Sequence, residues 1–329
     1  MAEILPMISQ LDRRYKTLQS QRSQWESHWQ ELADYMLPRK ADITKKRTQG
    51  DKRTELLFDG TAVHAVELLA SSLHGMLTSP STPWFSMRFR DPMLQQSDAA
   101  NEWLETSIDQ MYQAFHRSNF QQEIHELYYD LVVFGTAAFY VEGADDGLRF
   151  SSRHIAEICI SENPEGRVDT VYRKFKLTAR AIEMQFGEEN CPKEIKKDIE
   201  NDPYKEHSIV HAVFPRADAK GRAKKNKPIA SIYYTADTRQ LLSESGFDEF
   251  PFMVTRFVKD SVSTYGRSPA MNALPDTKML NKMSETTIRA AQKQIDPPLM
   301  VPDDGFMLPV RTTPGALNFY RSGTRDRLE

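Results

Sequence analysis

The sequence has few cysteines and no long apolar run. Only Cys159 and Cys191 are cysteines among 329 residues, too few for a disulfide framework or a four-thiolate zinc site, and compatible with a reducing compartment. No segment approaches the roughly 20 apolar residues of a membrane-spanning helix. The first ten residues lack the basic and apolar segments of a signal peptide. We therefore expect a soluble protein that is neither secreted nor membrane-bound.

An excess of charge of one sign is also missing. The 43 basic and 46 acidic residues give a formal net charge of -3, with 40% hydrophobic and 27% charged residues. This is a globular balance, and it argues against a general polyanion binder while leaving room for a local basic patch. The length suggests two or three domains.

Enzyme motifs are absent as well. The sequence contains no glycine-rich phosphate loop, no GxSxG, no HExxH and no CxxC. His64 and His74 have no third ligand at a metal-binding spacing, so we interpret them as surface or capping residues. The Asp-Asp-Gly segments at 145–147 and 303–305 are typical of turns rather than of cation sites. We predict no catalytic residue, no cofactor and no metal ligand.

One pair of residues resembles part of an enzyme motif. Asp276 and Lys278 look like half of a metal-dependent nuclease motif, in which a carboxylate holds Mg²⁺ and a lysine stabilises the transition state. That motif requires its residues on adjoining strands. Here Pro275 and Asp276 are typical of the first turn of a helix, so the helical interpretation is favoured.

The N-terminal segment predicts one long helix. Arg22 interrupts an otherwise regular apolar series, and Pro38 ends it. We expect this helix to pack on a domain core rather than to form a separate coiled coil. Its apolar residues recur at steps of three and four: Ile8, Leu11, Tyr15, Leu18, Trp25, Trp29, Leu32 and Met36.

Further helices are expected before residue 135. After a polar, basic loop over 39–53, we predict a helix over 54–77 with Leu69 and Met76 among its inward-facing residues. Alternation over 84–89 predicts a strand. Ser97 is expected to cap a third helix, and Asn119 with Gln122 forms a capping box for a fourth that reaches Phe134.

From Gly135 the pattern changes from helical spacing to alternation. We therefore predict an α+β fold in which the N-terminal helices pack against a mixed or antiparallel sheet. Thr178 and Pro192 begin short helices, and a long helix runs over 270–295. The expected strands cover 136–141, 156–160, 168–177, 208–214, 229–235 and 252–258, and shorter strand-like pieces follow at 299–301, 307–310 and 317–320.

Two clusters of charge are candidate binding sites. The long helix carries a charged stripe at steps of four, three, four and four: Lys278, Lys282, Glu285, Arg289 and Lys293. Composition alone favours a solvent-exposed face for it. A basic run, interpreted as a solvated hairpin tip or a phosphate-contacting loop, contains Arg216, Lys220, Arg222, Lys224, Lys225 and Lys227.

Several segments, in order along nearly the whole chain, resemble the head-to-tail connecting (portal) proteins of short-tailed, double-stranded DNA bacteriophages. They are Trp25, Trp29, Ala33, Tyr35 and Pro38, then Phe58–Ala62, Arg167–Arg180, Phe252–Phe257, Tyr265–Pro269, Leu280–Lys282, Ala290–Ala291 and Pro297–Asp303.

The resemblance implies a domain plan. Residues 1–268 would form the wing, helical over 1–134 and α+β over 135–268. Residues 269–296 would be the first stem helix, and 297–329 would begin a small β-rich clip. Family members continue with a second stem helix and a crown, so we expect a chain truncated at its C-terminus, which folds its wing but forms no working connector.

The resemblance also implies a non-enzymatic function. About twelve copies would form a ring at one capsid vertex, and double-stranded DNA would pass through it without sequence readout during packaging and ejection. The implied partners are other copies, the terminase motor, scaffold or capsid proteins and tail adaptors, with no membrane. The implied location is the virion, at the capsid vertex, and the host cytoplasm during assembly; alternatively, the protein is encoded in a prophage. The charged stripe would face the channel or a neighbouring stem helix. The alternatives are a phage metal-dependent nuclease or hydrolase, and a non-enzymatic adaptor or scaffold module.

Overall fold

The computed structural model describes residues 4–45, 47–48, 50–144, 147–216 and 226–295. It divides into two compact units, Met1–Lys278 and Met279–Glu329. The helices are α1 (Ile4–Met36), α2 (Thr61–Leu77), α3 (Pro92–Gln95), α4 (Asp98–Arg117), α5 (Phe120–Phe134), α6 (Ala179–Phe186), α7 (Lys193–Asn201) and α8 (Pro269–Ile295). The strands are β1 (Thr136–Ala144), β2 (Gly147–Arg153), β3 (Ile158–Glu162), β4 (Val168–Thr178), β5 (Glu206–Pro215), β6 (Ile229–Thr235), β7 (Leu241–Phe247) and β8 (Phe252–Arg256).

The predicted α+β class is confirmed. The strands form a three-stranded sheet in the order β2-β1-β8 and a five-stranded sheet in the order β3-β4-β5-β6-β7, and every strand pair given for them is antiparallel. The helices up to Phe134 precede both sheets, as the change of sequence pattern at Gly135 predicts. Within the described ranges, no helix is both long and apolar enough to cross a bilayer.

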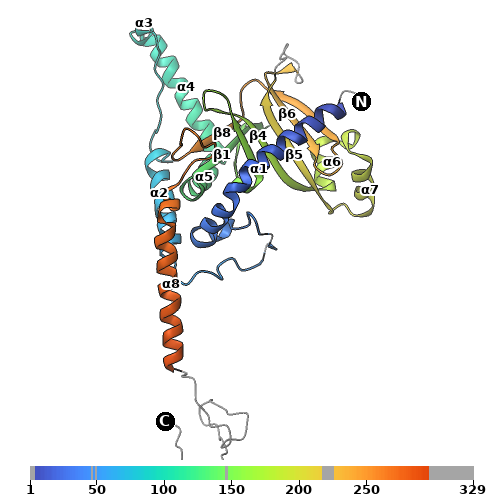
Figure 1. Ribbon diagram of the computed structural model, residues 1–329. Coiled ribbons are helices and arrows are strands. Elements are labelled where there is room, and N and C mark those ends of the chain that lie inside the picture. Colours follow the sequence, from blue (N-terminus) through green and yellow to red (C-terminus); the bar gives the residue numbers. More distant parts are fainter. Residues whose placement is uncertain (1–3, 46, 49, 145–146, 217–225, 296–329) are drawn as a thin grey trace, which may run out of the picture. The chain divides into compact units, whose positions relative to one another are not determined.

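Helix α1 packs on the sheet rather than standing alone. In Figure 1 it runs in blue across the five-stranded sheet. Every apolar residue of its predicted series is buried except Trp25, which is half-buried. Arg22, the interruption, is itself buried: its guanidinium donates to the carbonyl oxygens of Ala156 (2.9 Å) and Ile158 (2.8 Å) and pairs with Glu26. The arginine thus satisfies backbone acceptors at the start of β3, as buried polar groups require.

Strand β3 separates two parts of the core. Cys159 lies in the cluster that contains Ile8 and Tyr15 of α1, whereas Ile158 and Ile160 lie in the cluster that contains Trp29. Side chains alternate between the two faces of a strand, so Cys159 points to the opposite face from Ile158 and Ile160. Both faces of this strand are therefore buried.

Gly135 joins the helical part to the segment that leads into α8. It ends α5 with a φ of +73°, and a Cβ there would lie 2.6 Å from the backbone of both Gly266 and Arg267. The N–H of Gly266 donates to the Thr136 hydroxyl (2.8 Å), and the Ser268 hydroxyl donates to the Val133 carbonyl (2.8 Å). Only glycine combines that φ with so close an approach.

Some predicted boundaries are wrong. Helix α2 begins at Thr61, not at 54, and Leu69 and Met76 are exposed rather than inward-facing. Residues 84–89 form no strand, because the N–H groups of Trp84 and Phe85 donate to the Tyr112 hydroxyl, both at 2.7 Å, instead of to a ladder.

The cap predictions have mixed outcomes. Thr178 accepts a hydrogen bond from the N–H of Ala181, as expected of an N-cap. Asn119 stands at the N-cap position of α5, but it makes no side-chain cap hydrogen bond, since its amide pairs with the N–H and carbonyl of Phe150. Pro275 lies inside α8, not in its first turn. The predictions for 145–146 and for 299–320, including Asp303–Gly305, lie outside the described residues.

Candidate assembly surface and charged stripe

Helix α2 is rich in apolar residues, yet most of them are not buried among the described residues. Its 17 residues contain a single acidic or basic side chain other than histidine, Glu67. Only Val66 and Ala70 are buried, where the helix packs against α5 and α1. Apolar side chains left in solvent on one helix are candidates for contact with another surface. The uncovered side of α2 is therefore a candidate interface.

Large apolar side chains mark the uncovered side of α2. Leu68 is 62% exposed and Met76 is 82% exposed, and Leu69 and Leu77 are also exposed. Exposed apolar residues scattered singly are common, whereas several large ones on one helix make it a candidate interaction site. We call these four residues the α2 surface.

Helices α3 and α4 also expose large apolar side chains. None of the 20 residues of α4 is buried, although the helix has a clear apolar side. Trp103 is 64% exposed, with Phe89 stacked on it at a ring-centroid distance of 6.4 Å. Met93 of α3 is 82% exposed. Helices α3 and α4 thus expose large apolar side chains, whereas α1 and the sheets bury theirs.

The predicted charged stripe on α8 forms two separate ion-pair groups. Glu285 pairs with both Lys282 (2.9 Å) and Arg289 (2.5 Å), and the hydrogen bond from Lys282 is the main cause that lowers the pKa of Glu285. Lys278 instead pairs with Glu31 of α1, which raises the pKa of Lys278. Lys293 is exposed, and no ion pair to it is found among the described residues. The Glu285 group and Lys293 therefore each keep a net positive charge.

The basic run is described only at its two ends. Arg216 donates to Glu244 (3.1 Å) and to the Ser245 carbonyl (3.1 Å), and Lys227 pairs with Asp248 (2.7 Å). Both ends are therefore attached to β7 or to the residues just after it. Lys220, Arg222, Lys224 and Lys225 lie outside the described residues.

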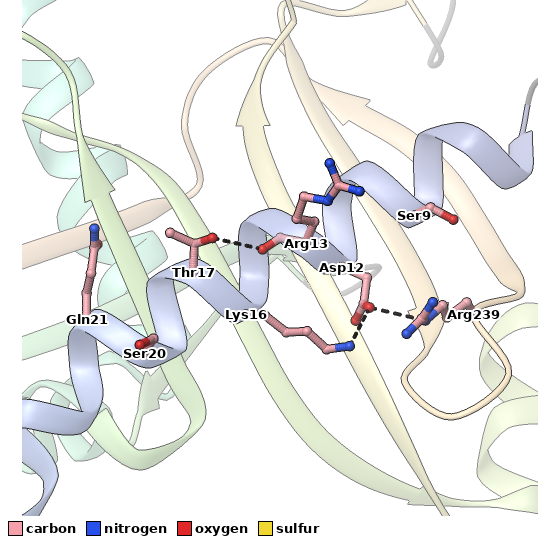
Figure 2. Close-up of a pocket in the computed structure, with 8 residues that line it drawn as sticks. All are labelled: Ser9, Asp12, Arg13, Lys16, Thr17, Ser20, Gln21 and Arg239. Carbon is pink, nitrogen blue, oxygen red and sulfur yellow. Dashed lines mark hydrogen bonds and ion pairs between the residues drawn. The ribbon is translucent and has the colours of Figure 1, made fainter.

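A polar groove lies along the outer side of α1, and Figure 2 shows its eight lining residues. Asp12, which is buried, accepts ion pairs from Lys16 (3.0 Å) and Arg239 (3.1 Å). Arg239 belongs to the β6–β7 turn and has a φ of 52°, a backbone conformation unusual for a residue with a side chain. The groove thus attaches α1 to this turn, and we assign it a structural role.

The remaining candidates take ordinary structural positions. His74 contacts Gln121 (2.7 Å) and lies 5.1 Å from the His125 ring, while His64 is exposed. Asp276 is exposed on α8. Among the described residues, no three His, Cys, Asp or Glu side chains gather closely enough to hold a metal ion.

Sequence reasoning missed the α2 surface because it assigned the apolar residues of α2 to the core. The available signal was composition: a nearly uncharged helix can be covered from several sides, and one sequence alone does not say by what. The stripe on α8 was found from its spacing, although the pairing of Lys278 with Glu31 was not.

Comparison with known proteins places the chain in a family. A model of the bacteriophage head to tail connecting protein family matches residues 9–328. The probable portal protein of Bordetella phage BPP-1 is 31% identical over 313 residues, which cover 93% of this chain and 56% of that protein. The portal protein of Salmonella phage epsilon15 is 31% identical over 310 residues, covering 92% and 56% respectively.

The chain therefore belongs to the bacteriophage head to tail connecting protein family. The resemblance seen in the sequence is confirmed over nearly its whole length. The chain spans little more than half the length of these two portal proteins.

Proposed function

We propose that this chain is a structural subunit of a phage portal. In an assembled particle, about twelve portal subunits in a closed cyclic ring would occupy one capsid vertex and surround the path of double-stranded DNA. The family membership and the names of the two relatives support this role. In it, residues 1–268 serve as the wing, 269–296 as the first stem helix and 297–329 as the beginning of the clip. The chain needs no catalytic residue for such a function.

The α2 surface is the observation that carries the proposal. Each large apolar side chain that leaves water contributes about 1.5–3 kcal/mol, and four such side chains stand uncovered on one helix. A ring supplies a neighbouring copy at the same place on every subunit, so one surface is covered in all copies at once. The exposed Met93 and Trp103 extend the area that a neighbour can cover.

The charged stripe on α8 suits passage of DNA rather than tight binding. The Glu285 group and Lys293 retain positive charge, and Arg289 and Lys282 are about two-thirds exposed. Exposed cations attract phosphates without reading sequence and lose this attraction as salt rises. The carboxylate of Glu285 limits the attraction, which keeps DNA able to move. We assign Lys278, Lys282, Glu285, Arg289 and Lys293 to the channel wall or to contacts between stem helices.

Assembly is tested on the α2 surface itself. The double variant Leu68→Glu, Met76→Glu should remain monomeric at concentrations at which the unaltered chain forms larger species, measured by mass photometry and electron microscopy. The matched control, Met184→Glu with Tyr204→Glu, also replaces two strongly exposed apolar residues, but near the five-stranded sheet. It should assemble normally. Equal assembly of both variants would contradict the role of α2.

The DNA role needs a separate experiment. Replacing Lys278, Lys282, Arg289 and Lys293 by alanine should leave ring formation intact and change DNA packaging or retention in assembled particles. Changed packaging with normal rings would support the assignment. Unchanged packaging would remove the stripe from the DNA path without affecting the assembly argument.

A further inference from the structure

A pocket of about 520 Å³ is lined by residues of both sheets. The three-stranded sheet contributes Tyr140 and Arg153, and the five-stranded sheet contributes Arg173 and His211. Two carboxylates, Glu142 and Glu157, and two further cations, Arg149 and Lys176, also line it. The portal function proposed above uses none of these residues.

Arg153 is the unusual member of this pocket. Its Nε is buried without a hydrogen-bond acceptor, and among the described residues no carboxylate forms an ion pair with it. Its nearest described aromatic neighbour is the ring of Tyr140, 5.5 Å from the guanidinium carbon. Burial, together with the nearby Arg173, lowers the pKa of Arg153. The side chain is thus a partly buried cation that makes no direct ion pair among the described residues, although Glu157 and Glu142 lie near it.

The second arginine is held in a different way. Arg173 pairs with Glu157 through its Nε (2.7 Å), and its guanidinium lies over the ring of Phe175 at 4.1 Å. Glu157 is therefore paired with Arg173 and not with Arg153. Among the described residues, the ion pair found for Glu142 is with the rim residue Arg149, at 4.0 Å.

The inner wall of the pocket carries no charge near pH 7 and contains a stacked pair of rings. His211 is buried, shares a hydrogen bond with the Ser231 hydroxyl (2.9 Å) and lies parallel to Tyr233 at a centroid distance of 3.9 Å. Burial, with the charges of Arg173 and Arg153, lowers the pKa of His211 to about 3. The imidazole is therefore neutral near pH 7, and it neither adds to nor cancels the charge of Arg153.

We propose that this pocket binds one acidic side chain, an aspartate or glutamate, of a protein partner, with its carboxylate paired to the guanidinium of Arg153. A partly buried cation is costly when unpaired, and the planar fork of arginine matches a carboxylate with two parallel hydrogen bonds. Tyr140 and Phe252, whose rings lie 4.7 Å apart, offer an apolar wall for the methylene groups of the incoming side chain.

The other charges of the pocket favour a single carboxylate over nucleic acid. Glu142 and Glu157 stand in the same wall and would repel the successive phosphates of a polyanion. Nucleic-acid surfaces instead present rows of cations along an open groove. Pairing with Arg173 offsets the charge of Glu157, so one carboxylate beside Arg153 meets less repulsion than a row of phosphates would.

The test uses malonate as a soluble carboxylate probe on the complete chain. Sodium malonate at about ten times its dissociation constant should raise the Tm by about 2 °C relative to sodium chloride at equal ionic strength. Arg153→Gln should lose this rise. Arg149→Gln, which removes an exposed arginine from the rim of the same pocket, should keep it.

Several results would overturn the proposal. They are an equal Tm in malonate and chloride, an unchanged malonate response in Arg153→Gln, and a larger Arg153-dependent response to sodium phosphate than to malonate. If Arg153→Gln does not fold, Arg153→Lys is used instead, because lysine keeps the positive charge but lacks the planar guanidinium. An apparent malonate affinity at least fivefold weaker in Arg153→Lys than in the unaltered chain would support the two parallel hydrogen bonds. An equal affinity would contradict them.

Discussion

Two regions of this chain treat apolar residues in opposite ways. Helix α1 buries its apolar series against the five-stranded sheet, and its interrupting arginine is buried with full hydrogen bonding. Helices α2 to α4 leave leucine, methionine and tryptophan side chains in solvent. The first region is complete within one chain. The second exposes large apolar side chains that no described residue covers, which is what a subunit of an assembly requires.

The largest expected effect tests this contrast with the same substitution in both regions. Trp29→Ala should lower the free energy of unfolding by about 3–5 kcal/mol, because Trp29 is fully buried and packs against Trp25 and Tyr265. Trp103→Ala, in the monomer, should change it by less than about 0.5 kcal/mol. Urea unfolding at low protein concentration measures both. Similar losses of unfolding free energy at the two positions would show that Trp103 of α4 is packed as tightly as Trp29 of α1.

The next effect concerns the buried arginine of α1. Arg22→Met should cost about 3 kcal/mol, since it leaves the carbonyls of Ala156 and Ile158 without their charged donor. Arg13→Met, at an exposed position of the same helix, should be nearly neutral. Denaturant curves of the two variants give the comparison directly. A small cost for Arg22→Met would mean that water replaces the guanidinium.

A pH-dependent effect of smaller size is expected from His211. Its pKa is lowered to about 3 by burial and by two arginines, so below about pH 6.5 the unfolded chain binds a proton that the folded chain does not. The stabilisation is complete above that pH and is lost as the pH falls towards 3. Between pH 7 and pH 5 the wild-type chain should lose about 2 kcal/mol more than His211→Gln. Parallel stability curves for the two proteins would contradict the neutral, buried histidine.

The smallest expected effects lie at the ends of the basic run. Lys227→Ser should cost at most about 0.5 kcal/mol, because its pair with Asp248 is largely exposed. Arg216→Ser should cost about 1–2 kcal/mol, because it loses Glu244 and the Ser245 carbonyl at a half-buried position. Thermal unfolding separates the two. A loss of stability greater than about 0.5 kcal/mol for Lys227→Ser would show that this end of the basic run contributes to folding.

The parts of the fold that were predicted correctly have strong local signals. The series from Ile8 to Met36 repeats over eight apolar positions, and only a helix brings them to one face. Thr178 and Gly187 enclose α6 as cap residues do. Strands β2 and β7 were missed because serine, arginine and glutamate interrupt their apolar residues, as at half-exposed strands.

The candidate sites were predictable to different degrees. The stripe on α8 follows from spacing alone, whereas the pairing of Lys278 with Glu31 joins residues from the two ends of the described chain. Arg153 and Arg173 meet because two sheets face each other, and nothing near either residue in the sequence marks that encounter. Tertiary contacts of this kind carry no local pattern.

Hydrogen exchange during assembly tests the central claim most directly. Exchange is followed on the same chain at a dilute, monomeric concentration and at one at which larger species form. We expect the amides of α2 to exchange much more slowly on assembly. The exchange of those of β4 and β5, already buried in the monomer, should change little. Assembly with unchanged exchange in α2 would contradict the claim that this uncovered helix forms the contact between subunits.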